Sequence, residues 1–277
     1  MEKVNYLNLA CGGKFHKSWV NVDMMIMDPS VIKADLLKGI DFPDNTFTVV
    51  YHSQFIEHLA RDKGFSFMLE CHRVLKPGGI IRIVTPDLEN IVRNYLFYLE
   101  KCISEPNEIN AANYDWLLLE MYDQTTRNYN GGEMSKVLNK ENLINEQFII
   151  DRTGIAGKMI RQSFSEPTPQ VYIPPKNNFK EIFASVGRKL RQSYLKTVLP
   201  KKETELLEMG RFRVSGEIHY WLYDRYSMRR LLQETGFKDI SFKTPYESSI
   251  PNWSSYELDV KGGAPIDPTS LFVEASK

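Results

Sequence analysis

The sequence predicts an α/β fold built on a mostly parallel sheet, and two observations support this prediction. Short apolar runs alternate with helical patterns over the first hundred residues, which is typical of parallel strands joined by right-handed crossovers. The same alternation returns near residue 226, after a long stretch that lacks it. The simplest architecture is a discontinuous core, residues 1–100 and 226–277, with a mostly helical insert at residues 101–225.

Five strands are expected in the N-terminal part of the core, each a short apolar run. They are Tyr6–Ala10, Trp19–Asp23, Val31–Ala34, Thr46–His52 and Ile80–Thr85. Apolar residues recur on one face of Gly64–Leu75, which predicts a helix, and "KPGG" is a Pro/Gly stop that turns into the next strand. A second helix is predicted from Leu88 to Leu99, with Asp87 as its N-cap.

The C-terminal part of the core is expected to hold one helix and two strands. Ser227 is positioned to cap a helix that carries Leu231 and Leu232, and Gly236 to end it. The stretches "DISFKTPYE" and "SLFVEASK" then have the character of two last strands.

The composition argues against several classes of protein. The chain has 277 residues with Lys+Arg and Asp+Glu both at 35, so its net charge of zero does not favour nucleic-acid binding. No apolar run approaches the roughly 20 residues that span a bilayer, and the N-terminus lacks a secretory pattern. Cys11, Cys71 and Cys102 have no CxxC spacing, which fits a reducing cytoplasm better than a disulfide framework. We therefore expect a cytoplasmic location.

The insert carries a basic segment, residues 176–213, with ten Lys/Arg against four Glu. A Pro-rich connector, "SEPTPQVYIPP", precedes it, and residues 179–198 have an amphipathic helical pattern. Three interpretations stay open: a solvated face of surface helices, a lid over an anionic substrate, or a patch that contacts anionic lipid at a membrane surface.

Small and acidic residues follow the first two expected strands. Ligands bind an open parallel sheet at the carboxyl ends of its strands, and small side chains there let a ligand approach backbone N–H groups. Asp23, followed by Met24, ends the second strand, and its carboxylate can accept two hydrogen bonds from a ribose diol. The turn after the first strand consists of Ala10, Cys11, Gly12 and Gly13.

The ends of the third and fourth strands complete the pattern. Asp35 can accept a hydrogen bond from an exocyclic amine while Leu36 packs on a purine face, and His52 and Ser53 offer a polar wall. Four consecutive strand ends therefore describe a pocket for an adenine nucleoside.

The turn argues against a pyrophosphate ligand. It reads "GGKFHK", which lacks the G-x-G-x-x-G spacing of dinucleotide sites, and the chain contains no G-x-x-x-x-G-K-[ST]. Lys14 and Lys17 keep a dinucleotide open as an alternative.

Two motifs resemble a known family. "FIEHL" (residues 55–59) and "ECHRVLKPGGIIRIVTPD" (residues 70–87) are similar to the class I S-adenosylmethionine-dependent methyltransferases of the type 11 group, which includes bacterial polysaccharide and small-molecule enzymes. The resemblance covers residues 4–90 well and 226–277 in outline. It implies a Rossmann-like, seven-stranded, mostly parallel sheet with an antiparallel last strand, and S-adenosylmethionine as cofactor.

The resemblance also assigns roles. The turn 10–13 would face the methionine part of the cofactor, Asp23 the ribose, Asp35 and Leu36 the adenine, and His52 with Ser53 the floor near the sulfonium.

The chain departs from the family pattern in its first strand and crossover. Asn8 stands in place of an acidic residue, Ala10 in place of the first glycine and Lys14 in place of the last, so we expect Asn8 to orient the turn without adding charge. Only about six residues separate the turn from the second strand, against the ten or so that a helical crossover requires. We therefore expect residues 14–18 to form a loop.

The acceptor site is expected near "EIHYWLYDRYS", residues 217–227. His219 is the candidate catalytic base, because an imidazole normally titrates near neutral pH. Packing of this stretch as core is the alternative, and His52 and His58 are rival bases. No metal site is expected, since HExxH is absent and the five His have no ligand spacing.

The predicted function is transfer of a methyl group from S-adenosylmethionine to a hydroxyl, or an amine, of a small molecule or glycan. The helical insert and its basic surplus favour a bulky acceptor such as a nucleotide sugar or lipid-linked saccharide. Two alternatives remain: a non-catalytic scaffold with a methyltransferase-like fold, and an NAD-dependent oxidoreductase.

Overall fold

The computed structural model of the chain describes residues 5–26, 28–165, 191, 194–195 and 197–277. Its main sheet consists of β1 (Tyr6–Leu9), β2 (Val20–Asp23), β3 (Val31–Lys33), β4 (Phe47–Ser53), β5 (Leu75–Pro86), β6 (Lys238–Lys243) and β9 (Ser270–Ser276). A two-stranded ribbon is formed by β7 (Val260–Lys261) and β8 (Ala264–Pro265). The α-helices are α1 (Arg61–Val74), α2 (Leu88–Ser104), α3 (Glu108–Thr126), α4 (Gly132–Leu138), α5 (Glu146–Ser165), α7 (Lys201–Arg213) and α8 (Arg225–Glu234). Short 3₁₀ turns are η1 (Leu36–Lys38), η2 (Ile56–His58) and η3 (Trp253–Tyr256).

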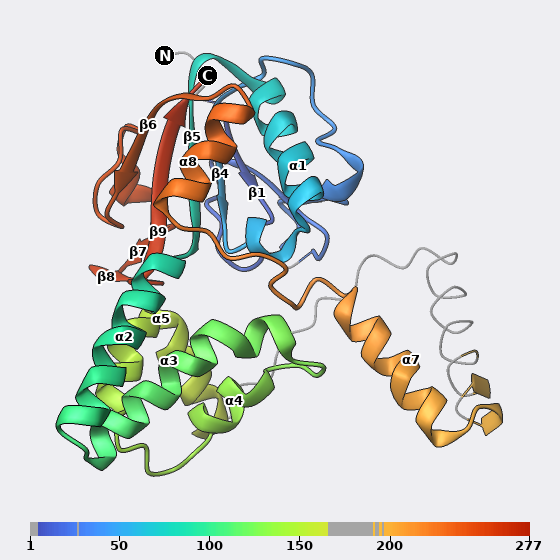
Figure 1. The fold of residues 1–277 in the computed structure, drawn as a ribbon. Coiled ribbons are helices and arrows are strands. Elements are labelled where there is room, and N and C mark those ends of the chain that lie inside the picture. The colour runs from blue at the N-terminus through green and yellow to red at the C-terminus, as the bar shows by residue number, and fades with distance from the viewer. Residues whose placement is uncertain (1–4, 27, 166–190, 192–193, 196) are drawn as a thin grey trace.

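The seven strands lie in the order β3-β2-β1-β4-β5-β9-β6 (Figure 1). The pairs among β1, β2, β3, β4 and β5 are parallel, and β9 runs antiparallel to both β5 and β6. The predicted seven-stranded, mostly parallel sheet with an antiparallel last strand is confirmed. The strand order reverses between β1 and β4, so the carboxyl ends of these two strands flank the switch point where ligands of such sheets bind.

Helices α1 and α8 cover one face of the sheet (Figure 1). The side chains of successive strand residues point to opposite faces, so Leu7, Val50 and Ile81 contribute to the core on this side. The helices contribute apolar side chains at helical spacing, namely Phe67, Met68, Cys71, Val74, Met228, Leu231 and Leu232.

The opposite face of the sheet is covered by residues 250–258, which include the aromatic residues Trp253 and Tyr256. Tyr6 and Tyr51 alternate with the residues of the first face, and Trp253 from η3 packs against them. Trp19 lies among these rings, with its centroid 6.1 Å from that of Trp253. The expected loop at residues 14–18 is confirmed, because no helix forms between β1 and β2.

One local prediction was wrong and another is refined. Helix α1 ends at Val74, just before "KPGG", as predicted; β5 already begins at Leu75, but its pairing with β4 jumps from Phe47↔Leu75 to Val49↔Ile80. Ser227 does not cap α8; Asp224 is the N-cap, and Ser227 completes a capping box three residues later. The predicted cap of α2 is confirmed, since the Asp87 side chain accepts a hydrogen bond from the Glu89 N–H.

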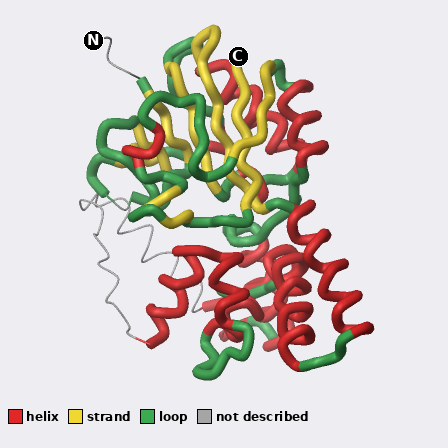
Figure 2. The backbone as a smooth tube through the Cα atoms, turned by 90° about the vertical axis from the view of Figure 1, so that its left-hand side faces the viewer, coloured by secondary structure: helices red, strands yellow, loops and turns green. Residues whose placement is uncertain are grey.

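The helices α2, α3, α4 and α5 pack together beyond the carboxyl ends of the strands (Figure 2). Because α2 crosses residue 100 and packs on α3, we propose that the helical part begins at Leu88 rather than at residue 101. A break in α5 at Gly154, with φ +58°, lets it approach the β8–β9 connection. A Cβ at Gly154 would lie 2.6 Å from the Ile266 carbonyl oxygen, so only glycine fits there without strain.

Some predictions fall outside the described residues. These are the Pro-rich connector, nearly all of the amphipathic pattern at 179–198 and much of the basic segment at 176–213. Within the described part of that segment, α7 buries none of its residues. Among the described residues, no helix is long and apolar enough to cross a membrane.

Candidate active site

The turn after β1 and the end of β2 form one hydrogen-bonded unit. Ala10 and Gly12 have left-handed φ values of +51° and +48°, which turn the chain sharply at the end of β1. The Gly12 N–H donates to Asp23 Oδ2 and the Met25 N–H donates to Asp23 Oδ1, both at 2.8 Å. An ionised carboxylate has about four acceptor positions, so Asp23 retains acceptor capacity for a diol after these two bonds.

Asn8 and Lys14 fix the next part of the turn. The buried Asn8 side chain donates from Nδ2 to the Lys14 carbonyl at 2.9 Å, so it orients the loop without adding charge. Lys14 Nζ lies 2.6 Å from Asp267 Oδ2, just before β9. This ion pair offsets the Lys14 charge, which would otherwise repel a cationic ligand.

The turn has open space for a ligand. A Cβ placed on Gly12 or on Gly13 would meet no heavy atom within 4 Å. Burial, followed by the Asp23 carboxylate, raises the pKa of the Cys11 thiol to about 12, so Cys11 is a neutral side chain. The open backbone therefore leaves room for a ligand beside the Asp23 carboxylate.

Both residues expected to contact adenine, Asp35 and Leu36, already have a structural role within the protein. Asp35 Oδ1 caps η1 by accepting from the Leu37 N–H at 3.1 Å. The Leu36 side chain lies in the core with 8% exposure, whereas Leu37 is 57% exposed, and Met24 beyond Asp23 is 55% exposed. Leu36 therefore packs in the core rather than on a purine face, and the exposed apolar side chains that follow β2 and β3 include Met24 and Leu37.

His52 is not a wall of the site, and this prediction is corrected. The residue is fully buried, and its ring packs near those of Phe55 and Phe67 at centroid distances of 6.4 and 5.2 Å. Neither ring nitrogen has a hydrogen-bond partner in the part of the chain that the structure describes. Burial lowers the pKa of His52 to about 3, so it is a neutral core side chain. Ser53, at the end of β4, is half-buried and remains available.

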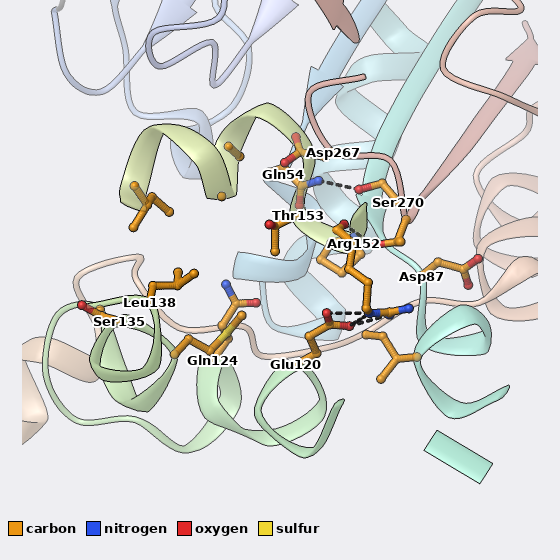
Figure 3. Close-up of a pocket in the computed structure, with 18 of the residues that line it drawn as sticks. Gln54, Asp87, Glu120, Gln124, Ser135, Leu138, Arg152, Thr153, Asp267 and Ser270 are labelled. Carbon is orange, nitrogen blue, oxygen red and sulfur yellow. Dashed lines mark hydrogen bonds and ion pairs between the residues drawn. The ribbon is translucent and has the colours of Figure 1, made fainter. Parts of the chain in front are cut away.

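A cavity of about 660 Å³ lies between the strand ends and the helices α3, α4 and α5 (Figure 3). Gln54, Asp267 and Ser270 line it from the sheet, and the Gln54 amide donates to the Ser270 hydroxyl at 2.9 Å. Because Asp267 also pairs with Lys14, the cavity and the turn after β1 share a wall.

An ion pair forms the opposite wall of the cavity. Arg152 donates to Glu120 through Nε at 2.8 Å and through Nη2 at 2.5 Å, and both side chains are at most 10% exposed (Figure 3). Trp116 and Asn90 supply further hydrogen bonds to Glu120 and Arg152, respectively. Arg127 lines the same cavity, and its Nε has no hydrogen-bond partner among the described residues.

His219 lies behind the cavity rather than in it. Its backbone N–H donates to the carbonyl of Gln124, a lining residue, but the His219 side chain is 5% exposed and is not part of the lining. Burial, then the neighbouring His58 and Arg127, holds its pKa well below the usual value. The expectation of a base that titrates near neutral pH is therefore wrong.

Two residues of the "FIEHL" motif have a setting that the sequence did not reveal. Glu57 is fully buried, its Oε2 accepts from the Thr85 hydroxyl at 3.0 Å, and burial raises its pKa to about 8. The neighbouring His58 ring lies perpendicular to that of His219, with centroids 4.6 Å apart. Since His219 is distant in sequence, no spacing rule could have joined these three residues.

The order and direction of the strands define a Rossmann-like fold, whose ligands bind at the carboxyl ends of the strands. Residues 10–83 match the family model of the methyltransferase domain. This match, together with the order and direction of the strands, supports a methyltransferase domain that uses S-adenosylmethionine as its cofactor.

Solved structures similar to the chain include methyltransferases of two microorganisms. A SAM dependent methyltransferase from Archaeoglobus fulgidus shares 12% identity at a TM-score of 0.39, with 99% of this chain and 86% of that chain covered. An S-adenosylmethionine dependent methyltransferase from Mesorhizobium loti shares 11% identity at a TM-score of 0.38, with 99% and 91% covered. No curated protein matches the chain.

Proposed function

We propose that the enzyme transfers the methyl group to a hydroxyl oxygen of a small molecule or glycan that occupies the 660 Å³ cavity. The observation that carries this proposal is the shared wall: Asp267 lines the cavity and pairs with Lys14 of the cofactor turn. In this arrangement the cofactor binds at the turn, the acceptor binds in the cavity, and the Asp267 carboxylate lies between them.

The cofactor supplies an already activated methyl group, so the protein's main tasks are alignment of the reactants and exclusion of water. In our proposal Asp23 accepts hydrogen bonds from the ribose, while the turn 10–13 receives the methionine part. Asp35 and Ser53 border the same strand ends. Two carboxylates near the turn, Asp23 and Asp267, offset the positive charge of a sulfonium without a covalent role for Cys11.

Asp267 is the carboxylate that we propose to accept the proton of the acceptor hydroxyl. Among the described residues three carboxylates line the cavity. Glu120 is held by Arg152 and Trp116, and Asp87 caps α2. Asp267 pairs with Lys14 through Oδ2. Its Oδ1 accepts no hydrogen bond from the described part of the chain.

The size and the polar lining of the cavity support a polyhydroxylated or phosphate-bearing acceptor, such as a nucleotide sugar or lipid-linked saccharide. Its volume accommodates a drug-sized molecule. Arg127 contributes a guanidinium to the lining, and such a group can donate to phosphate or sugar oxygens. Asn130 and Gln124 add further polar groups to the lining.

The test is release of S-adenosylhomocysteine from S-adenosylmethionine in the presence of a panel of nucleotide sugars, free saccharides and amines. We expect release above background with acceptors that have free hydroxyls, and a loss of turnover in Asp267→Asn that is much larger than its loss of cofactor affinity. The matched variant Lys14→Met removes the ion pair but keeps the carboxylate, so it should retain turnover. Release only with amines would contradict transfer to oxygen, and equal turnover by Asp267→Asn would exclude that residue as the proton acceptor.

A further inference from the structure

Three potential metal ligands meet beside the cavity, although two distant parts of the chain supply them. Glu57 and His58 lie in η2, and His219 lies on the segment that leads into α8. Each offers one ligand atom, and the three atoms lie within 4.8 Å of one another. Ligand atoms about 2.1 Å from a tetrahedral cation lie about 3.4 Å apart, so shifts of about 1.4 Å in the side-chain positions would complete the set.

Two of the three side chains are buried with an atom that has no protein partner. Glu57 is 0% exposed and His219 is 5% exposed. Glu57 Oε1 and His219 Nδ1 have no hydrogen-bond partner among the described residues. Buried polar atoms nearly always have a hydrogen-bond partner. Two such atoms that lack one in the same cluster therefore indicate a bound group that interacts with both.

The third side chain has the orientation of a metal ligand. His58 Nδ1 lies 3.1 Å from the carbonyl oxygen of Ile218. Since a carbonyl oxygen can only accept, Nδ1 carries the proton and Nε2 keeps its lone pair. Metal-binding histidines usually donate their second ring nitrogen to a carbonyl or carboxylate in this way. His58 is only half-buried, which leaves a path for an ion to enter.

We propose that Glu57, His58 and His219 bind a divalent first-row transition cation, with Zn²⁺ as the best match. Two imidazole nitrogens and one carboxylate oxygen suit Zn²⁺ and its neighbours, whereas Mg²⁺ and Ca²⁺ prefer oxygen ligands alone. Three protein ligands leave at least one coordination position open. Arg127 brings a positive charge near His58 and His219, and it donates to the Glu217 carbonyl at 2.7 Å and faces the Glu217 carboxylate at 3.9 Å.

The cation would lie behind the cavity wall. The His219 N–H binds the Gln124 carbonyl, and Gln124 and Arg127 both line the cavity. The site shares no ligand with the proposed methyl transfer, because neither the cofactor turn nor Asp267 is among its ligands, although Asp267 and Lys14 act electrostatically on Glu57. Metal binding and turnover can therefore succeed or fail separately.

The test uses the full chain, stripped with a chelator and titrated with Co²⁺ as a visible-absorbance probe, then with Zn²⁺ in competition. We expect one equivalent to bind and Zn²⁺ to raise the melting temperature, because the ion binds the folded state. Loss of a supporting hydrogen bond to a metal ligand costs 10- to 100-fold in affinity. Loss of a direct ligand in Glu57→Gln or His219→Gln should therefore cost about 100-fold or more.

Matched variants separate the site from general damage to the fold. Glu57→Gln keeps an oxygen that can accept from Thr85, so it should fold with an unchanged circular dichroism spectrum. His72→Gln, a histidine of α1 that packs against Phe237, should bind the metal as the original protein does. The proposal is overturned if the unmodified protein binds no Co²⁺ or Zn²⁺ at millimolar metal, or if Glu57→Gln and His219→Gln both bind with unchanged affinity.

Discussion

Replacement of His52 with leucine should make the stability of the protein less sensitive to acid. Burial lowers the pKa of His52 to about 3 in the folded chain, against about 6.5 for an unperturbed imidazole. Between these two values the unfolded chain binds more protons, so the free energy of unfolding rises with pH. The contribution of His52 is fully present above about pH 6.5 and is lost as the pH falls toward 3.

The magnitude follows from the two pKa values. At pH 5 the protonated fraction of the unfolded imidazole stabilises the unfolded chain by about 2 kcal/mol relative to pH 8. Leucine does not titrate, so the stability difference between the two proteins should change by about 2 kcal/mol over this interval. At pH 8 the leucine variant should be at least as stable, because it removes two buried nitrogens that lack partners among the described residues.

The assay is urea unfolding followed by tryptophan fluorescence at pH 8, 7, 6 and 5. Ile83→Val is the matched control, because Ile83 is fully buried and pairs with His52 across β4 and β5. It should lower stability by about 1 kcal/mol at every pH. Parallel pH curves for the original protein and His52→Leu would refute the reasoning, as would a loss of several kcal/mol at pH 8.

Three further substitutions probe the site and the docking of the helical part. Asp23→Asn should weaken cofactor binding by about 10- to 100-fold in calorimetry, and unchanged affinity would remove Asp23 from the site. Arg152→Met leaves Glu120 buried and unpaired, so unfolding free energy should fall by about 3–5 kcal/mol; recovery in Arg152→Met/Glu120→Leu checks that cause. Gly154→Ala forces a Cβ against the Ile266 carbonyl at a φ of +58°, so it should cost roughly 2 kcal/mol or more, and an unchanged melting temperature would argue against this close approach.

The first five strands could be predicted because the sequence carries local signals for them. Apolar runs and the turn at 10–13 mark the first strands, and the short reach from Gly12 to Asp23 correctly predicts the lost crossover helix. The cap of α2 at Asp87 was equally local. Asp224 was overlooked as the cap of α8 because Ser227 is an equally good capping residue by type, and only the backbone conformation separates them.

The chemistry of the site could not be predicted as well, because pKa values and exposure depend on tertiary packing. His52 has the position of a site residue along the chain, but Phe55 and Phe67 enclose it. His219 has a suitable side chain, but it faces His58 behind the cavity. Asp267 was not considered, since its approach to Lys14 joins the two ends of the chain and leaves no pattern in the sequence.

The central claim is that the cofactor S-adenosylmethionine binds between the turn 10–13 and Asp23. Isothermal titration calorimetry with S-adenosylmethionine and with S-adenosylhomocysteine tests this claim most directly. We predict that both ligands bind with one-to-one stoichiometry and that Asp23→Asn weakens both. The absence of binding by either ligand at millimolar concentration, in a protein that is folded by circular dichroism, would contradict it.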